Sequence, residues 1–95
     1  MDPRNYHYTH YFSTIFEDRT GIPFSQRIWK EILAGIAHVN KPHCKVDNKG
    51  RYSEYMTFTI QNVLITFVFD GHTHKLITCI KETHVKNYKK LQEID

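Results

Sequence analysis

The stretch that decides the fold runs from Arg51 to Lys81 and reads RYSEYMTFTIQNVLITFVFDGHTHKLITCIK. It holds three runs rich in β-branched and aromatic residues, separated at Gln61-Asn62 and at Asp70-Gly71. The first run alternates apolar and polar residues, as a strand with one buried face does. The middle run, from Val63 to Phe69, is apolar at nearly every position, which predicts a central strand buried on both faces. We therefore expect an antiparallel meander at the centre of the fold.

Two helices are predicted before this meander. Ser25 is a favourable N-cap for the better defined of the two, which carries an apolar stripe and ends near His38–Val39. Phe24 and Trp29 stand at the positions of a hydrophobic staple around this N-cap. An earlier helix is predicted from Thr9 to about Arg19, where four apolar residues are spaced for one helix face: Tyr11, Phe12, Ile15 and Phe16.

Helices followed by strands predict a single α+β domain of 95 residues. Both helices are expected to pack on one face of a three- to four-stranded antiparallel sheet. We expect an N-terminal arm or a short edge strand at residues 1–8, the helices within 9–39 and the sheet within 43–82, where His43 to Val46 is a short additional strand. Residues 83–95 are expected to form a tail with a short helix that exposes Lys86, Lys89 and Lys90.

The composition is that of a globular chain, with 40% hydrophobic and 24% charged residues, and an aromatic content of 14% that argues against disorder. A formal charge of +3 with seven histidines permits nucleic-acid contact without requiring it. No apolar run has the length of a signal peptide or a membrane span, so we expect a cytoplasmic protein without membrane association. Cys44 and Cys79 are then expected to be free and mostly buried, with a disulfide between them as the alternative.

Two pairs of residues are candidates for catalysis. His10 opens the first predicted helix and Arg19 lies near its end, and a positioned imidazole can transfer protons near neutral pH. Lys81 and Thr83 share one face at the end of the last strand, where an ammonium group and a hydroxyl can hold a phosphoryl group. A solvent-exposed arm and a solvated strand end are the alternatives for these two pairs.

Further residues are candidates for RNA contacts. On the first long strand, Arg51 is placed to hold a phosphate and Tyr55 to stack on a base, although threonine and tyrosine also fill ordinary solvent-facing sheet surfaces. His72 and His74 follow the second turn and complete the predicted RNA-binding set.

The same two histidines also raise the question of a metal. Two residues apart at a strand end, His72 and His74 would share one face, and with His43 or Cys44 they would make part of a site. Further ligands at close spacing are missing, and two histidines in a turn are more often solvated. We therefore expect no metal and no other cofactor.

Several features together carry a resemblance to a known group of proteins. These features are a first helix with a histidine and an arginine, a second helix that opens with a small residue, and a strand hairpin that ends in I-T-x-I-K-x-T. The pattern resembles small bacterial ribonuclease toxins of the RelE-like and BrnT-like kind, within the barnase–EndoU–colicin–RelE fold group. The residues that carry it are His10, Arg19, Phe24 to Ala37, Gly50-Arg51-Tyr52, Val63 to Asp70 and Ile77 to Thr83.

The resemblance implies metal-independent endoribonuclease activity on tRNA or mRNA, in which the ribose 2′-OH attacks the adjacent phosphate. It implies that His10 is the acid or base, that Arg19 and Lys81 stabilise the phosphate, and that Thr83 orients it. His72 or His74 would replace His10 if His10 proved remote. A cognate inhibitor, or antitoxin, is the implied partner. The low net charge departs from the pattern and weakens the expectation of tight RNA binding.

A second hypothesis belongs to a different class of protein, namely a non-catalytic interaction module of a phage or regulatory type. Such a module would bind a protein partner through exposed aromatic residues, for which Tyr6, Tyr8, Tyr11 and Tyr55 are the candidates. A flat aromatic patch, or a symmetric dimer through an edge strand, would distinguish it from the ribonuclease. A hydrolase that uses a metal at His72 and His74 is a third and more distant hypothesis.

Overall fold

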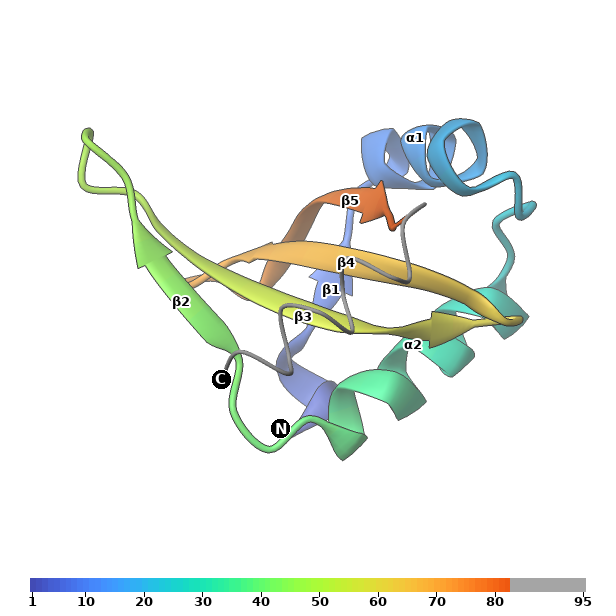
Figure 1. The fold of residues 1–95 in the computed structure, drawn as a ribbon, viewed down its shortest axis with the longest axis horizontal. Coiled ribbons are helices and arrows are strands. Elements are labelled where there is room, and N and C mark those ends of the chain that lie inside the picture. The colour runs from blue at the N-terminus through green and yellow to red at the C-terminus, as the bar shows by residue number, and fades with distance from the viewer. Residues whose placement is uncertain (83–95) are drawn as a thin grey trace.

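The computed structural model describes residues 1–82 and shows an α+β fold with two helices and a five-stranded sheet (Figure 1). In this sheet the strands lie in the order β1-β5-β4-β3-β2, with β1 parallel to β5 and all other neighbours antiparallel. The elements in chain order are η1 (Pro3–Asn5), β1 (His7–Tyr8), α1 (His10–Thr20), α2 (Gln26–His38), β2 (His43–Val46), β3 (Tyr52–Ile60), β4 (Val63–Asp70) and β5 (Lys75–Lys81).

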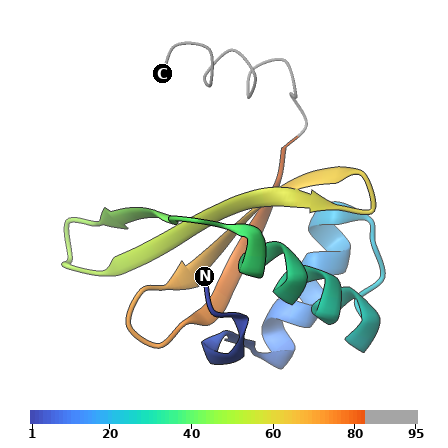
Figure 2. The ribbon, with the colours of Figure 1, turned by 90° about the horizontal axis from the view of Figure 1, so that it is seen from below.

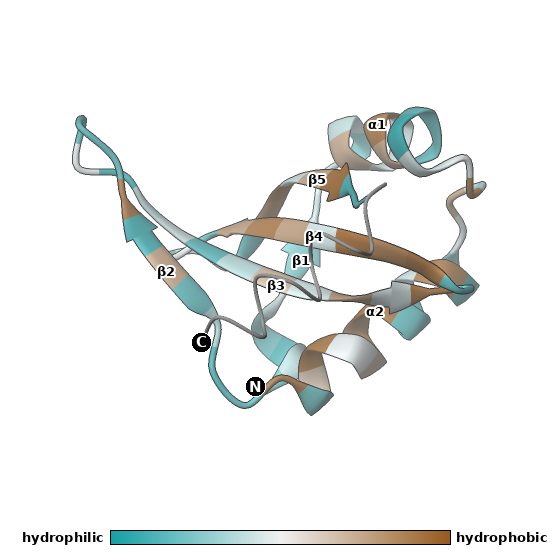
Figure 3. Cartoon of the chain, in the orientation of Figure 1, coloured by the Kyte–Doolittle hydropathy of each residue, from teal (hydrophilic) through white to brown (hydrophobic). Residues whose placement is uncertain are grey.

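Both helices lie on the same face of the sheet, as predicted (Figure 2). α1 packs along β5 and α2 packs beneath β3. β4, in the middle of the sheet, is a largely apolar ribbon, whereas the tip of the β2–β3 hairpin is polar (Figure 3). The largest fully buried side chains fill the space between helices and sheet: Phe12, Phe16, Ile32, Ile36, Met56, Ile60, Ile65, Phe67, Phe69, Leu76 and Cys79. Neither helix of residues 1–82 is long and apolar enough to cross a membrane.

Local signals in the sequence set the element boundaries. The side chains of Thr9 and Ser25 accept hydrogen bonds from backbone N–H groups in the first turns of α1 and α2, which makes both residues N-caps. α1 ends at Gly21, whose φ of 76° is the left-handed conformation that glycine adopts without strain. Gln61 and Asn62 form the predicted two-residue turn, and both have positive φ as a type I′ turn requires.

The sheet differs from the prediction in its strand number and in one strand direction. A fifth strand, β1, pairs in parallel with the start of β5, so that His7 lies opposite Lys75 and Tyr8 opposite Leu76. A strand of two residues is too short to show an alternating pattern, which is why the sequence left both an extended arm and a short edge strand open for residues 1–8. The predicted helical tail and Thr83 lie outside the described residues.

Burial corrects three further expectations. Tyr11, which the helical spacing placed on the apolar face of α1, is 67% exposed. Cys44 is exposed, as are all four residues of β2, whereas Cys79 is buried as predicted. Both thiols are free. The predicted double burial of β4 is only partly correct. On the helix-facing side Ile65, Phe67 and Phe69 are fully buried. On the other face Val68 is buried while Leu64 and Thr66 are half-buried.

Candidate acid–base site

A buried carboxylate lies on the helix-facing side of β3. The Glu54 side chain is only 6% exposed, and its neighbours on the same face of the strand are Tyr52 and Met56. Because burial of a charged group is unfavourable unless the group is hydrogen-bonded, the partners of Glu54 decide whether this position is stable. Two partners reach it from other parts of the chain.

The first partner is His74, on the turn between β4 and β5. Its Nδ1 atom lies 2.9 Å from Oε1 of Glu54. The His74 backbone has a φ of 60°, a left-handed conformation that is uncommon for residues other than glycine. Non-glycine residues in this region are frequent at functional sites, where the surrounding contacts hold them. The His74 side chain is 31% exposed, so solvent and ligands have access to the ring.

The second partner is Tyr6, from the N-terminal segment before β1. Its hydroxyl lies 3.3 Å and 3.4 Å from the two carboxylate oxygens of Glu54. Its ring packs against His74 with a centroid distance of 4.7 Å. Burial, followed by the negative charge of Glu54 and the hydrogen bond to it, raises the pKa of the Tyr6 hydroxyl well above its ordinary value. Tyr6 therefore stays a neutral donor to the carboxylate.

More titratable side chains lie next to this cluster, toward the β2–β3 hairpin. The hydroxyl of Tyr52 lies 2.9 Å from Sγ of Cys44, and this hydrogen bond raises the pKa of the Tyr52 hydroxyl. The His72 ring lies against the Tyr52 ring at a centroid distance of 5.6 Å. The site thus consists of the Glu54–His74–Tyr6 cluster with His72 at its exposed side.

The hydrogen bond to Glu54 defines what His74 can do chemically. When the Glu54 carboxylate is ionised it only accepts hydrogen bonds, and Nδ1 of His74 is then the atom that carries the proton toward it. In the neutral imidazole the other ring nitrogen, Nε2, has a free lone pair and can take a proton from a substrate. The geometry suits general acid–base catalysis. Within residues 1–82, no group of three or more His, Cys, Asp or Glu side chains is arranged to hold a metal ion.

The residues predicted for catalysis divide between the two ends of β5. Arg19 donates hydrogen bonds to the Thr78 hydroxyl and to the carbonyl oxygen of Cys79, which places it near the end of β5 where Lys81 lies. His10 opens α1 at the opposite end, about 13 Å from Arg19 along the helix axis, since each residue adds about 1.5 Å. The structure brings Arg19 and the last turn of α1 to β5 but does not bring His10 to them.

The residues predicted to bind RNA lie on both faces of the sheet. Tyr55 is on the face away from the helices, where its ring contacts His43 and lies 5.5 Å from Nζ of Lys45. Arg51 forms an ion pair with Asp47 at the exposed tip of the β2–β3 hairpin. His74 lies on the helix-facing side instead, together with His72.

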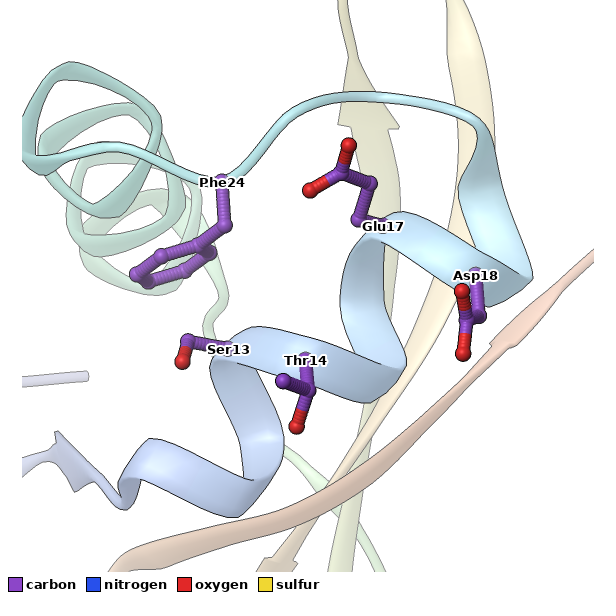
Figure 4. Close-up of a pocket in the computed structure, with 5 residues that line it drawn as sticks. All are labelled: Ser13, Thr14, Glu17, Asp18 and Phe24. Carbon is purple, nitrogen blue, oxygen red and sulfur yellow. The ribbon is translucent and has the colours of Figure 1, made fainter.

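A hollow on the described surface lies elsewhere. It has a volume of about 430 Å³ and lies between α1 and the segment before α2, with Glu17, Asp18 and Phe24 in its walls (Figure 4). None of the predicted catalytic residues lines it. Two carboxylates would repel a phosphate, so this hollow is a poor site for RNA.

Sequence reasoning gave His74 as an RNA-binding residue and as a substitute for His10, and it gave Tyr6 only as an exposed anchor for a protein partner. It did not find Glu54. One signal was present for Glu54. It interrupts an otherwise apolar and aromatic face of the first long strand, where Tyr52, Met56, Phe58 and Ile60 are its neighbours. A charged residue on a buried strand face requires a partner, and the partners were not visible because they lie 20 and 48 residues away in the chain.

The fold and the site together describe a small α+β protein with a histidine–carboxylate pair at one end of its sheet. Comparisons with protein-family models, with curated proteins and with solved structures found no match to this chain.

Proposed function

We propose that this chain is a metal-independent endoribonuclease that acts on tRNA or mRNA, with His74 as its proton-transfer group. The observation that carries the proposal is the 2.9 Å contact between Nδ1 of His74 and the buried carboxylate of Glu54. This contact fixes the ring and leaves Nε2 without a partner among residues 1–82, which is what a general base requires. His74 replaces His10 in this role because His10 lacks such a partner among the described residues.

The proposed reaction needs no group beyond the protein and water. Nε2 of His74 takes the proton of a ribose 2′-OH, the 2′-oxygen forms a bond to the adjacent phosphorus, and the bond from phosphorus to the 5′-oxygen breaks. An acid returns a proton to that 5′-oxygen, so the products are a 2′,3′-cyclic phosphate and a free 5′-hydroxyl. We assign the acid role to His72, because it lies on the same turn as His74 and is exposed beside Tyr52.

The proposal extends to class and partners. A ribonuclease of the toxin type, active in the cytoplasm, would damage the cell that makes it, so we propose a cognate inhibitor or antitoxin protein that covers the acid–base site. Arg19 and Lys81, at the far end of β5, would contact the RNA backbone at a distance from the cleaved bond. Their roles rest on charge and position alone.

The test is a cleavage assay with purified protein, total tRNA and mRNA in excess EDTA. His74→Asn is the key variant, since asparagine accepts the left-handed backbone but cannot transfer the proton. We expect it to lower the cleavage rate roughly 10²- to 10⁴-fold, the range of a lost acid–base group. His7→Ala is the matched control, because His7 is an exposed histidine on the adjacent strand and its loss should leave the rate unchanged.

Two further variants separate the possible outcomes. If His10→Ala or Lys81→Ala abolishes discrete cuts while His74→Asn does not, the activity is retained and the assignment of His74 is wrong. If wild-type protein leaves RNA intact at high concentration, the ribonuclease proposal fails. Thermal unfolding of each variant confirms that a lost activity is not a lost fold.

One observation favours the interaction module as a second candidate. Tyr11 is 67% exposed and Ile77 is 42% exposed, and both line a hollow of about 410 Å³ at the start of α1. Exposed aromatic and aliphatic side chains beside a hollow are typical of protein-binding surfaces. The other three proposed anchors are weaker, because Tyr6 is buried while Tyr8 and Tyr55 are half-buried.

A further inference from the structure

The second half of β3 has a free edge. β2 pairs only with Tyr52 to Tyr55, so within residues 1–82 no strand pairs with Met56 to Ile60 on that side (Figure 1). Hydrogen-bonded directions alternate along an antiparallel strand, and Ser53 and Tyr55 direct their backbone groups toward β2. Thr57 and Thr59 continue this alternation and therefore direct their N–H and C=O groups outward from the free edge.

A hollow of about 380 Å³ lies beside this free edge, between α2 and β3. Ala34 and His38 of α2 and Phe58 and Ile60 of β3 contribute to its walls. Phe58 stacks on Phe67 with a centroid distance of 4.7 Å and an angle of 22° between the rings, which holds its ring in place. The hollow is therefore lined largely by apolar surface of fixed shape.

Glu31 also lines this hollow and carries the feature that most needs an explanation. Its Oε2 atom is buried and has no hydrogen-bond partner among the described residues. None of the ion pairs in residues 1–82 includes Glu31. A buried carboxylate oxygen without a partner is unfavourable, and nearly all such groups in native proteins are paired. The missing partner is a hydrogen-bond donor, most favourably a cationic one.

We propose that this free edge and this hollow together bind an extended segment of a partner protein that carries an arginine side chain. The segment would add a strand along Thr57 and Thr59, and its arginine would enter the hollow and pair with Glu31. Arginine suits the site better than lysine does, because a guanidinium group pairs with a carboxylate through two hydrogen bonds and stacks on an aromatic ring such as Phe58. The surface is distinct from the acid–base site, so it does not depend on the ribonuclease proposal.

The chain's own sequence argues against a second copy as the occupant. In a symmetric dimer through this edge, Met56 to Ile60 of one copy would pair with the same stretch of the other. That stretch reads MTFTI and contains no basic residue, so both Glu31 carboxylates would stay unpaired. A partner of different sequence satisfies the carboxylate, and a second copy does not.

The probe is an acetylated and amidated pentapeptide, Val-Thr-Arg-Thr-Val, titrated into ¹⁵N-labelled full-length protein and followed by NMR. The matched peptide contains citrulline, which keeps the shape of arginine and removes its charge. We expect the arginine peptide to bind at least about tenfold more tightly than the citrulline peptide, as loss of a charge-assisted hydrogen bond predicts. The amides of Thr57 and Thr59 should become protected from hydrogen exchange in the complex.

Three variants make the test specific. Glu31→Gln should abolish the preference for arginine over citrulline, whereas Glu17→Gln, which removes the same charge from an exposed position on α1, should not. Thr59→Pro removes one outward N–H group while leaving the pairing with β4, and should weaken both peptides. If Thr59→Pro does not fold, the comparison of Glu31→Gln with Glu17→Gln still tests whether Glu31 selects the arginine peptide.

Other results would overturn the proposal. Equal binding of the two peptides, or no binding at millimolar concentration, would show that Glu31 selects no cation. A dimer of the free protein in sedimentation, with Thr57 and Thr59 protected from exchange in the absence of peptide, would show that the occupant is a second copy.

Discussion

At position 54 a carboxylate faces the helices, on a side of β3 where Met56 and Ile60 are buried. An isolated charge at such a place would be unfavourable by several kcal/mol. The hydrogen bonds from Tyr6 and His74 offset this penalty. The same contacts that make Glu54 tolerable also orient His74, so stability and the proposed chemistry depend on one set of side chains.

Cys79 provides a prediction for alkaline pH. Burial raises the pKa of its thiol from 9.0 to about 11, although the Arg19 guanidinium opposes the shift. Between these values the unfolded chain loses the proton while the folded protein keeps it, so the free energy of unfolding should fall as pH rises from 9 toward 11. At about 1.4 kcal/mol per pKa unit, the loss is on the order of 2–3 kcal/mol. Tyr6 adds a loss of the same sign, because its pKa is also raised. Urea denaturation across this pH range measures the effect.

The control for this prediction is Cys79→Ala. The variant should be less stable than wild type at neutral pH because it leaves a cavity in the core. Its stability should fall less steeply between pH 9 and 10, since it has no thiol to ionise. Equal slopes in the two proteins would contradict the role of Cys79.

At the scale of elements, the packing of α2 on β3 depends on a glycine in the middle of the helix. A Cβ atom at Gly35 would overlap the ring of Phe58. Glycine normally weakens a helix by about 1 kcal/mol relative to alanine. Its presence here therefore has a packing reason, which is that it lets the helix approach the strand closely.

We expect Gly35→Ala to destabilise the protein, although the same change would stabilise an exposed helix. The overlap with Phe58 is unfavourable by about 1–3 kcal/mol, which outweighs the gain in helix propensity of about 1 kcal/mol. Ala37→Gly, at an exposed position of α2, measures the propensity term separately. In a double-mutant cycle, Gly35→Ala should lower stability less when residue 58 carries the Phe58→Leu substitution. An equal loss of stability in both backgrounds would contradict the overlap as its cause.

At the scale of the whole molecule, stability is unevenly distributed across the sheet. β4 lies between β3 and β5 and pairs along its length with both. β2 lies at the edge, pairs with only four residues of β3, and has no buried residue. Local opening of a segment requires less free energy where fewer buried contacts must break.

Native-state hydrogen exchange should therefore rank these strands. We expect amides of β4 such as Ile65 and Phe67 to exchange only through global unfolding, and the hydrogen-bonded amides of β2 to exchange through local opening at least about a hundredfold faster. Low concentrations of urea should leave the exchange of β2 unchanged and accelerate that of β4. If both strands responded to urea alike, the hairpin would belong to the same cooperative unit as the core.

Part of the candidate site was predictable from the sequence and part was not. The turn that carries His72 and His74 was predictable because Asp70-Gly71 interrupts two apolar runs. The pairing of His74 with Glu54 was not, because it requires the register between β3 and β4 and the left-handed backbone at His74. The separation of His10 from Arg19 followed from the geometry of the predicted helix. The distance of His10 from the far end of β5 did not, because it depends on how α1 lies along the sheet.

The sequence by itself determined the elements and the α+β class. Apolar periodicity, the N-caps Thr9 and Ser25 and the turn at Gln61-Asn62 are local signals, and each acts over a few residues. Only the tertiary structure decided that β1 joins the sheet in parallel, that Glu54 meets His74 and Tyr6, and that β3 keeps a free edge beside Glu31. These features join residues far apart in the chain, and their energy comes from burial and hydrogen bonds that exist only once the sheet and helices have packed together.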